Sequence, residues 1–371
     1  MPRSPRRSHP DACPGAIDVH RAVDGGLARV RVPGGALTAA QWRALADATA
    51  ELGDGGLELT SRANLQVRGL AAGAETALAA RLSAAGLLPS VTHERVRNIV
   101  ASPLSGRDGR GVLDVRSLVA ALDRALCADP ALAQLPGRFL FALDDGRGDV
   151  AGLGADVGLR GRTVLLAGQD SGLRVAPDEA VPVLLAAAHA FLALRGDHWR
   201  LSEIDDGAAL VAARLGSGPA AAPPARPVAH GPIGVIPQAD CRLAIAATAP
   251  LGRLDRAQIK VLCAAPGVVV TPWRSVVAVD LPDLGLLPAL ENAGLATDPG
   301  SSWVGVTACA GSTGCAKSAT DVRADAIAHH SGQSSPPLPV HWVGCPRACG
   351  SPAADHVRML ATEDGYMETQ P

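Results

Sequence analysis

The sequence predicts an α+β protein built from two similar halves, and three observations support this prediction. The segment PGGALTAAQW at residues 33–42 recurs as PLGRLDRAQI at residues 250–259. In both copies a β-like run ends at a Pro/Gly turn, and a helix and a second strand follow. The next elements also recur in the same order. A duplication of this kind predicts a pseudo-twofold molecule with a site between its halves.

Local signals define the elements of the first repeat unit. The β-like runs are residues 28–32 and 243–247. Thr38 and Asp255 can N-cap the helices that follow, because their side-chain oxygens accept hydrogen bonds from free backbone N–H groups. The second strands, residues 56–68 and 268–279, each carry Thr and then Arg at a bend. This pattern makes Arg274 the expected counterpart of Arg62, and we expect a structural ion pair for Arg274.

The repeat continues beyond these strands. β-like runs at 97–103 and 305–309 each enter a turn and then a helix, at 112–128 and 316–330, and strands at 137–142 and 340–345 follow. Only the second copy carries cysteines at these turns. Residues 219–237 contain six prolines and are the expected linker. The predicted units are 1–75, 90–218, the linker 219–237, 238–292 and 300–371.

Composition restricts the class of protein. The chain has 371 residues, of which 47% are hydrophobic, enough for two or three domains with sizeable cores. A formal charge of −2 provides no global field to attract nucleic acid or an anionic membrane. No apolar segment of signal-peptide length follows the basic N-terminus, and the longest apolar run, 181–194, predicts a buried helix. We expect a cytoplasmic protein that binds neither nucleic acid nor membrane.

Eight cysteines divide into two groups. Cys13, Cys127, Cys241 and Cys263 are scattered and do not form the framework of a secreted disulfide protein. The other four have regular spacing, C-x5-C for Cys309 and Cys315 and C-x3-C for Cys345 and Cys349.

The spaced cysteines are candidate metal ligands. Four thiolates suit zinc or a 4Fe-4S cluster, but C-x5-C is wider than the knuckles of structural zinc sites. The small residues around them let backbone amides approach inorganic sulfide. The pattern therefore favours a 4Fe-4S cluster held by Cys309, Cys315, Cys345 and Cys349 over zinc or inert thiols. A cluster needs an electron source, and Gly152-x-Gly154 lacks the rest of a nucleotide-binding fingerprint, so we expect a separate donor.

The cysteine spacing, the duplication and the run TSRANLQ at 60–66 together resemble the nitrite/sulfite reductase superfamily over nearly the whole chain. This resemblance implies a duplicated architecture, with ferredoxin-like half-domains and two further α+β domains of the cluster and haem type. The segments CPG at 13–15, DGG at 24–26, RVPGG at 31–35, TPWR at 271–274 and GCPRAC at 344–349 look like the precorrin-3B synthase family within it.

That family resemblance implies an oxygen-dependent monooxygenase of aerobic cobalamin biosynthesis. Such an enzyme hydroxylates precorrin-3A at C20 and closes a γ-lactone. The resemblance implies a 4Fe-4S cluster, a mononuclear non-haem iron, O2 as co-substrate, and electrons from NADH through a reductase or from a ferredoxin.

An alternative is a sulfite or nitrite reductase that uses sirohaem and a 4Fe-4S cluster. In such relatives the last cysteine also ligates the sirohaem iron, a role that would belong to Cys349. Sulfite reductases usually present two lysines in a PRKFK strand, whereas the matching run here is PGRFL at 136–140, with Arg138 and Leu140 at the lysine positions. Leu can neither donate a proton nor hold an anion, which favours the oxygenase. A third alternative is a non-enzymatic electron-transfer protein.

The resemblance also suggests which residues contact the substrate. Arginine binds carboxylates bidentately, and a tetrapyrrole carries many. Arg62 and Arg97 match positions that face the macrocycle or its substrate in the family, and Arg138 replaces a lysine in the same pocket. Asn64 and Gln66 alternate with Arg62 on one strand face. We expect these five residues to bind the tetrapyrrole.

Other polar and aromatic residues near the motifs are expected to be structural. The ligands of the non-haem iron are not identifiable, because His93, His341 and His356 show no ligand spacing. Arg68 and Arg95 are expected to be solvated charges. The tryptophans beside the motifs are expected to pack in the core: Trp273, Trp303 and Trp342.

Overall fold

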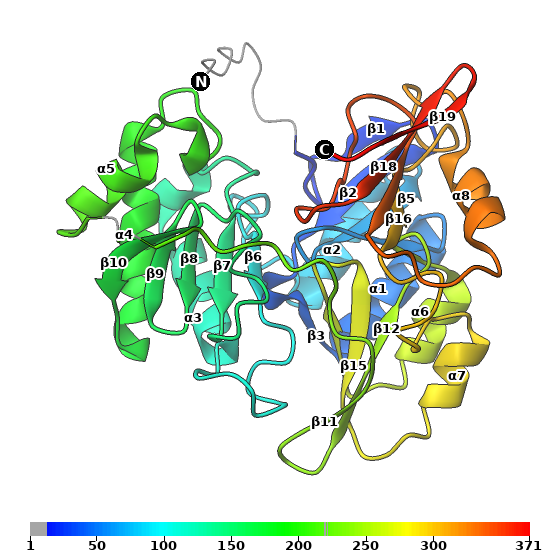
Figure 1. Cartoon of the computed structure of the whole chain (residues 1–371), viewed down its shortest axis with the longest axis horizontal. Helices are drawn as coiled ribbons and strands as arrows, with labels where there is room; N and C mark the ends of the chain where they lie inside the picture. Colours follow the sequence, from blue (N-terminus) through cyan, green and yellow to red (C-terminus); the bar gives the residue numbers. More distant parts are fainter. Residues whose placement is uncertain (1–12, 219, 221) are drawn as a thin grey trace. The chain divides into compact units, whose positions relative to one another are not determined.

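The computed structural model describes residues 13–218, 220 and 222–371 (Figure 1). The chain folds into two compact units: unit 1 contains residues 13 and 89–228, and unit 2 contains residues 14–88 and 229–371. The predicted segments 238–292 and 300–371 therefore share unit 2 with most of the predicted segment 1–75. The predicted segment 90–218 belongs to unit 1. Residues 1–12 of the first predicted segment, and residues 219 and 221 of the predicted linker, lie outside the described residues.

Unit 2 contains two five-stranded antiparallel sheets that exchange strands between the sequence repeats. The first sheet has the order β1 (His20–Ala22), β2 (Gly25–Val30), β5 (Leu65–Leu70), β4 (Leu57–Leu59) and β13 (Arg253–Leu254). The second has the order β11 (Gly234–Pro237), β12 (Leu243–Thr248), β15 (Ser275–Leu281), β14 (Gly267–Val270) and β3 (Ala36–Thr38). Each repeat thus contributes one short edge strand to the sheet of the other.

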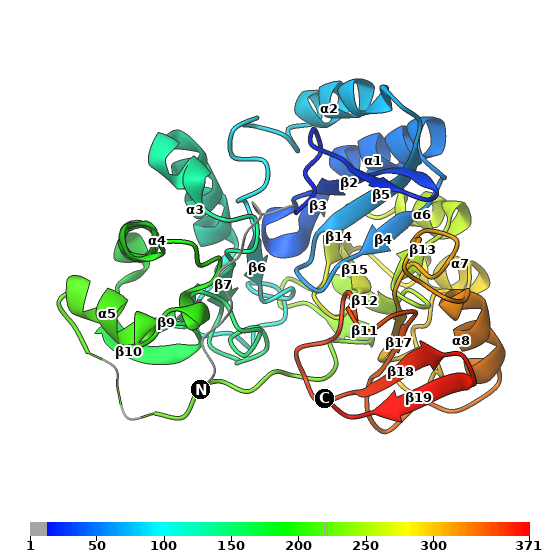
Figure 2. The ribbon, with the colours of Figure 1, turned by 90° about the horizontal axis from the view of Figure 1, so that it is seen from above.

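The helices of these repeats begin where the sequence predicts. Thr38 caps α1 (Ala39–Leu52) and Asp255 caps α6 (Arg256–Leu262), and each forms a capping box with a glutamine three residues later. The remaining helices are η1 (Pro33–Gly35), α2 (Ala74–Ala84) and α7 (Leu287–Asn292). Figure 2 shows α1 and α2 side by side over the sheet of β2 and β5. Trp42 of α1 is fully buried and donates its indole N–H to the carbonyl of Ile259 at 3.0 Å, which joins the two repeats.

Each predicted second strand is a hairpin with a tight turn. The Thr60 N–H donates to Asn64 O at 3.0 Å, and the Thr271 N–H donates to Ser275 O at 3.0 Å. Ala63 and Arg274 occupy the same turn position, with φ of 55° and 57°. The structural counterpart of Arg274 is therefore Ala63, and that of Arg62 is Trp273, one residue away from the match by residue type.

A third sheet type occurs once in each unit. In unit 1 it comprises β6 (Ile99–Ala101), β7 (Phe141–Asp144), β8 (Val157–Arg160), β9 (Thr163–Leu166) and β10 (Gln169–Arg174). In unit 2 it comprises β16 (Val306–Ala308), β17 (Val340–Val343), β18 (Val357–Thr362) and β19 (Gly365–Thr369). In both, the first three strands are parallel and the next is antiparallel. This shared order confirms the predicted duplication.

The crossover helices are α3 (Arg116–Ala128) and α8 (Val322–His330). Both start later than the sequence pattern predicts. Asp321 accepts hydrogen bonds from the N–H groups of Arg323 and Ala324, so α8 begins there, and the preceding residues form turns.

The apolar run of unit 1 forms a helix packed in the core, as predicted. It lies in α4 (Pro177–Leu194), which packs against α3 and β8 and buries Leu184, Ala187 and Phe191. By length and composition alone, α4 is the single helix of the described residues that could cross a membrane. The remaining helices of this unit are η2 (Pro130–Gln134), η3 (Leu201–Glu203) and α5 (Gly207–Arg214).

Candidate metal centre

The fold brings the two cysteine pairs to one edge of a parallel sheet. Cys309 directly follows β16, and Cys345 follows β17 after Gly344. Because β16 and β17 are parallel neighbours, both pairs meet at their carboxyl ends. The N–H of Cys309 donates to Trp342 O at 2.9 Å, and the N–H of Gly344 donates to Cys309 Sγ at 3.4 Å.

Two tight loops carry the other cysteines. Cys315 accepts a hydrogen bond at its carbonyl from the Ser318 N–H at 3.1 Å, and Cys345 accepts one from the Ala348 N–H at 3.1 Å. Ala348 has φ of 45°, which turns the chain toward Cys349. All four cysteines are free thiols; Cys349 is exposed and the other three are partly buried.

The other three thiols of the set influence Cys349 electrostatically. Burial raises the pKa of the Cys349 thiol, the Arg347 guanidinium opposes this, and the charges of Cys345, Cys309 and Cys315 raise it further. Within the described residues, no group of three or more His, Cys, Asp or Glu side chains is arranged to hold a single metal ion. A 4Fe-4S cluster distributes its four thiolates over several irons.

These residues fit a 4Fe-4S cluster. Apart from Pro346 and Arg347, the residues between the paired cysteines are small. A Cβ at Gly344 would collide with Ser318 Oγ, so the backbone approaches closely there. The N–H of Gly344 already donates to a cysteine sulfur, as amides around clusters do. Cluster ligation by the four cysteines stays a prediction.

Two buried side chains hold the loop that follows Cys345. His341 is fully buried, with Nδ1 2.8 Å from Thr307 Oγ1 and Nε2 3.1 Å from Cys349 O. A carbonyl can only accept, so Nε2 carries the proton. Burial, followed by the charge of Arg274, lowers the pKa of His341 to about 3, and His341 is therefore neutral. Arg274 donates from Nη2 to Gly350 O, rather than forming the ion pair that we expected.

Arg68 holds the other cysteine loop. It is 4% exposed and donates to Gly314 O, next to Cys315, at 2.7 Å. It also pairs with Asp24, with bonds of 2.7 and 2.9 Å. Arg68 is therefore not the solvated charge that was expected from the sequence. The alternation of polar residues at 62, 64 and 66 continues at 68, which was an available signal.

Glu58 is the shared acceptor of this arginine network. It is 7% exposed and receives Arg323 at Oε1, while Arg68 Nη1 lies 3.6 Å from its Oε2 and Arg253 Nη1 lies 3.8 Å from Oε1. Gln66 Nε2 donates to Oε2 at 2.7 Å. Burial opposes ionisation of Glu58, but the charges of Arg323, Arg68 and Arg253 outweigh it and lower its pKa.

Three of the predicted substrate residues lie in unit 2. Gln66 accepts from Arg29 Nη2 at 2.6 Å and donates to Glu58, so it is a member of the network. Asn64 is buried, and its Oδ1 accepts from the Val32 N–H at 2.9 Å. Arg62 lies partly buried in the hairpin turn. The contacts of Asn64 and Gln66 are explained by local structure, and substrate binding by them stays a prediction.

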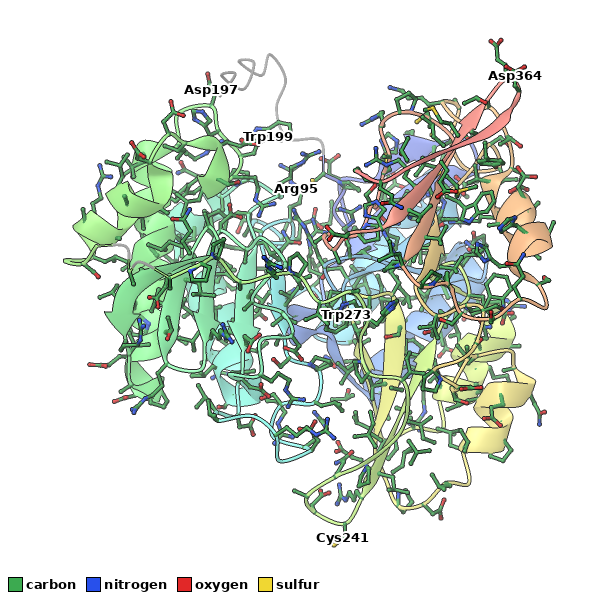
Figure 3. The ribbon with its side chains drawn as sticks, viewed as in Figure 1. Arg95, Asp197, Trp199, Cys241, Trp273 and Asp364 are labelled. Carbon is green, nitrogen blue, oxygen red and sulfur yellow. The ribbon has the colours of Figure 1, made fainter. Side chains whose placement is uncertain are left out.

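The other two predicted substrate residues belong to unit 1. Arg97 is 3% exposed and pairs bidentately with Asp123, with both bonds at 2.7 Å. Asp123 thus occupies the Nε and Nη2 edge of the guanidinium, one edge with which an arginine can bind a substrate carboxylate bidentately. Arg138 is exposed, and its guanidinium carbon lies 5.2 Å from the ring centroid of Trp199, which is labelled in Figure 3. Substrate binding by Arg97 and Arg138 also stays a prediction.

Unit 1 carries a polar loop at the position that holds cysteines in unit 2. Ser102 follows β6 as Cys309 follows β16, and donates to Asp149 Oδ1 at 2.6 Å. Burial raises the pKa of Asp149 to about 7, against the Ser102 hydrogen bond, and the charge of Asp144 adds to it. Arg147 pairs with Asp145 at 2.7 Å. The loop of the first copy thus has a serine where Cys309 stands in the second copy, together with hydrogen-bonded carboxylates.

The other two histidines near the motifs, His93 and His356, have backbone partners, as expected for structural residues. His93 Nε2 lies 2.9 Å from Asp129 O, and His356 Nδ1 lies 2.9 Å from Ala354 O. Trp342 is buried and donates to His330 Nε2 at 3.1 Å, while Trp273 and Trp303 are partly buried.

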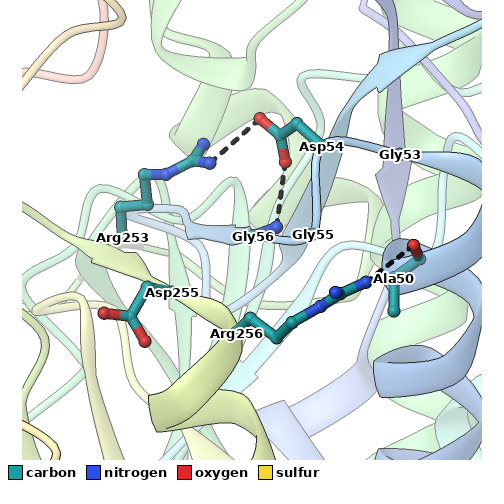
Figure 4. Close-up of a pocket in the computed structure, with 8 residues that line it drawn as sticks. All are labelled: Ala50, Gly53, Asp54, Gly55, Gly56, Arg253, Asp255 and Arg256. Carbon is teal, nitrogen blue, oxygen red and sulfur yellow. Dashed lines mark hydrogen bonds and ion pairs between the residues drawn. The ribbon is translucent and has the colours of Figure 1, made fainter.

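A polar pocket in unit 2 lies away from the cysteine loops in sequence. Figure 4 shows its lining around the turn after α1 and the start of α6. Arg253 pairs with Asp54 at 3.0 Å, and Arg256 donates to Ala50 O at 3.0 Å. Its charged groups are thus engaged in protein contacts.

Comparison with known proteins identifies the family. The family model described as the nitrite/sulfite reductase ferredoxin-like half domain matches residues 20–85. The chain is 31% identical to the ferredoxin–nitrite reductase of Synechococcus elongatus over 398 residues, covering 92% of this chain and 78% of that protein. The chain belongs to the nitrite/sulfite reductase family.

Two further known proteins match most of the chain. The precorrin-3B synthase of a Sinorhizobium species is 26% identical, covering 96% of this chain and 81% of that protein. The solved structure of Mycobacterium tuberculosis NirA protein has a TM-score of 0.74 at 23% identity, covering 93% of this chain and 73% of that chain. The NirA likeness confirms the predicted fold class.

These matches change the order of the expected activities. An oxidoreductase of the nitrite/sulfite reductase family is supported, but the expected precorrin-3B synthase activity has one distant relative behind it. The nitrite reductase match has the higher identity, 31% against 26%. The expected alternative, a sulfite or nitrite reductase, is therefore better supported than precorrin-3B synthase.

Proposed function

We propose that this chain is a reductase of a small oxyanion, with nitrite as the first candidate and sulfite as the second. The observation that carries the proposal is the convergence of four free cysteines at one sheet edge in a chain whose similarity to a nitrite reductase extends over 92% of its length. The proposed cofactors are a 4Fe-4S cluster and sirohaem. When bound, the cluster supplies electrons singly and the sirohaem supplies the metal at which the oxyanion is reduced.

The chain's own residues hold the proposed cluster. Cys309 and Cys345 come from adjacent strand ends, whereas Cys315 and Cys349 lie in the following loops. Arg68 and Arg274 donate hydrogen bonds to backbone carbonyls beside these two cysteines. These two arginines are 4% and 8% exposed, so their positive charges are poorly screened. A cluster with four thiolate ligands is anionic, and buried cations beside its loops stabilise it. Cys349 is the proposed shared ligand of the sirohaem iron.

The proposed electron donor is a separate protein. The Synechococcus elongatus relative is named for ferredoxin, and a donor of this class is proposed for this chain. Arg62, Arg97 and Arg138 remain the proposed contacts to the carboxylates of the tetrapyrrole or to the oxyanion, because the guanidinium fork matches both kinds of anion.

A second candidate is precorrin-3B synthase, and one observation favours it. Leu140 is 3% exposed and stands where the resemblance places a lysine of sulfite reductases. Its backbone N–H donates to Asp156 Oδ2 at 2.8 Å, so the strand is fixed with an apolar side chain at that position. Under this candidate the tetrapyrrole precorrin-3A is the substrate, and O2 and a mononuclear non-haem iron are required.

Pigment extraction and two assays distinguish these candidates. One sample of protein purified without oxygen would be extracted with acid acetone to recover any pigment. A second, native sample would be assayed for nitrite and sulfite consumption with reduced methyl viologen or ferredoxin as the electron donor. We expect extractable sirohaem and nitrite consumption. Protein that lacks sirohaem, contains more iron than sulfide, and hydroxylates precorrin-3A with O2 would replace the reductase with the second candidate.

A further inference from the structure

Arg274 occupies a position that is costly for an arginine. Its φ of 57° lies in the left-handed region, which a non-glycine side chain rarely adopts. Its side chain is buried, and burial lowers its pKa to about 10, so it is still charged at neutral pH. A Cβ at Gly252 would collide with the Arg274 side chain, so a glycine makes room for it. The equivalent turn position in the first repeat holds Ala63, which shows that the turn itself does not require arginine.

The contact made by Arg274 lies next to a proposed cluster ligand. Its Nη2 donates to Gly350 O, and His341 donates to the preceding carbonyl, that of Cys349, at 3.1 Å. Two buried side chains thus fix two consecutive peptide units at the end of the C-x3-C loop. A Cβ at Gly350 would collide with the same Nη2, so this approach also depends on a glycine.

The charge of Arg274 is less compensated than that of the other arginine that grips a cysteine loop. Arg68 forms a bidentate pair with Asp24 at 2.7 and 2.9 Å. Among the described residues, the acidic group that influences Arg274 is Glu58, and Glu58 is already engaged by Arg323 and Gln66. A buried cation with so little compensation is unfavourable unless an anion lies nearby.

We propose that Arg274 is a positioning residue that fixes the Cys349 loop and that its buried charge raises the reduction potential of the cluster. This inference depends on the proposed 4Fe-4S site. Reduction adds one electron from the external donor to an already anionic cluster. A fixed positive charge in a low-dielectric setting favours the reduced state, and this raises the potential.

The test is an EPR-monitored redox titration of the cluster in the intact protein and its variants. Arg274→Met removes the charge and the donor, Arg274→Gln removes the charge but keeps an N–H donor, and Arg274→Lys keeps the charge. The control is Arg256→Met, since Arg256 is exposed and donates to Ala50 O at 3.0 Å, far in sequence from the cysteines.

We expect a lower midpoint potential in Arg274→Met and Arg274→Gln, a potential near wild type in Arg274→Lys, and no change in Arg256→Met. Loss of the cluster from the Met and Gln variants with retention in the Lys variant also supports the assignment, because the charged donor is then what holds the loop. Met and Gln variants that keep both cluster and wild-type potential overturn this inference alone. A wild-type protein without a 4Fe-4S cluster overturns the proposed site itself.

Discussion

Replacing Glu58 with glutamine tests the arginine network that supports the cysteine loops. The substitution conserves size but removes the carboxylate shared by Arg323, Arg68 and Arg253. In the wild-type protein Glu58 Oε2 accepts a hydrogen bond from Gln66 Nε2 at 2.7 Å. The amide of the variant has one oxygen and one NH2 group, so one of the two positions that now accept from donors becomes a donor itself. Removing one partner of a buried ion pair costs about 3–5 kcal/mol.

Exposure of the partners sets where in this range the effect falls. Arg68 has a side-chain exposure of 5%, but those of Arg323 and Arg253 are 19% and 27%, so water relieves part of their loss. We therefore expect Glu58→Gln to lower the free energy of unfolding by about 2–4 kcal/mol at pH 7. Urea denaturation followed by circular dichroism measures this difference.

The pH dependence supplies an independent check. The pKa of Glu58 is lowered from 4.5 in the folded protein, so its contribution to stability is complete above pH 4.5 and is lost as the pH falls through the folded value. The difference between wild type and Glu58→Gln should be constant from pH 8 to 5 and shrink below pH 4.5. The control is Glu51→Gln, whose exposed pair with Arg81 should contribute little. If Glu58→Gln unfolds at pH 7 at the same urea concentration as this control, the reasoning is refuted.

Three further predictions concern other parts of the chain. Cys345→Ser should lose iron and sulfide, whereas Cys263→Ser, outside the proposed ligand set, should retain both by colorimetric assay. The pKa of Asp149 is raised from 3.8 to about 7, so its ionisation destabilises the fold as the pH rises through this interval. Asp149→Asn should therefore gain about 1–3 kcal/mol relative to wild type at pH 8 but not at pH 4 in denaturant titrations, and equal differences at both would contradict this. Thr38→Ala removes the acceptor for the Gln41 N–H and should cost about 1 kcal/mol by thermal unfolding, with Thr38→Asn as the matched control that retains an acceptor.

Features set by local sequence were the ones that could be predicted. The duplication, the caps at Thr38 and Asp255 and the strand ends that carry Cys309 and Cys345 follow from short-range patterns, and the structure contains each. The late start of α8 at Val322 was not anticipated, because the pattern of apolar residues does not reveal that Asp321 caps the helix.

Features set by distant partners could not be predicted from the sequence. The exchange of strands between repeats involves β3 and β13, which have three and two residues and carry almost no pattern of their own. Arg68 looked solvated because its partners, Asp24 and Gly314, are 44 and 246 residues away. Arg274 was matched to Arg62 by residue type, whereas hydrogen bonding of the turn aligns it with Ala63.

The most direct test of the account is to determine iron, acid-labile sulfide and zinc in the protein purified without oxygen, together with its EPR spectrum after reduction. The account predicts about four irons and four sulfides per chain, in addition to any sirohaem iron, and the EPR signal of a reduced 4Fe-4S cluster. Both iron and sulfide should be lost together in Cys309→Ser. Stoichiometric zinc, or a protein that takes up neither iron nor sulfide under reconstitution, would contradict the account.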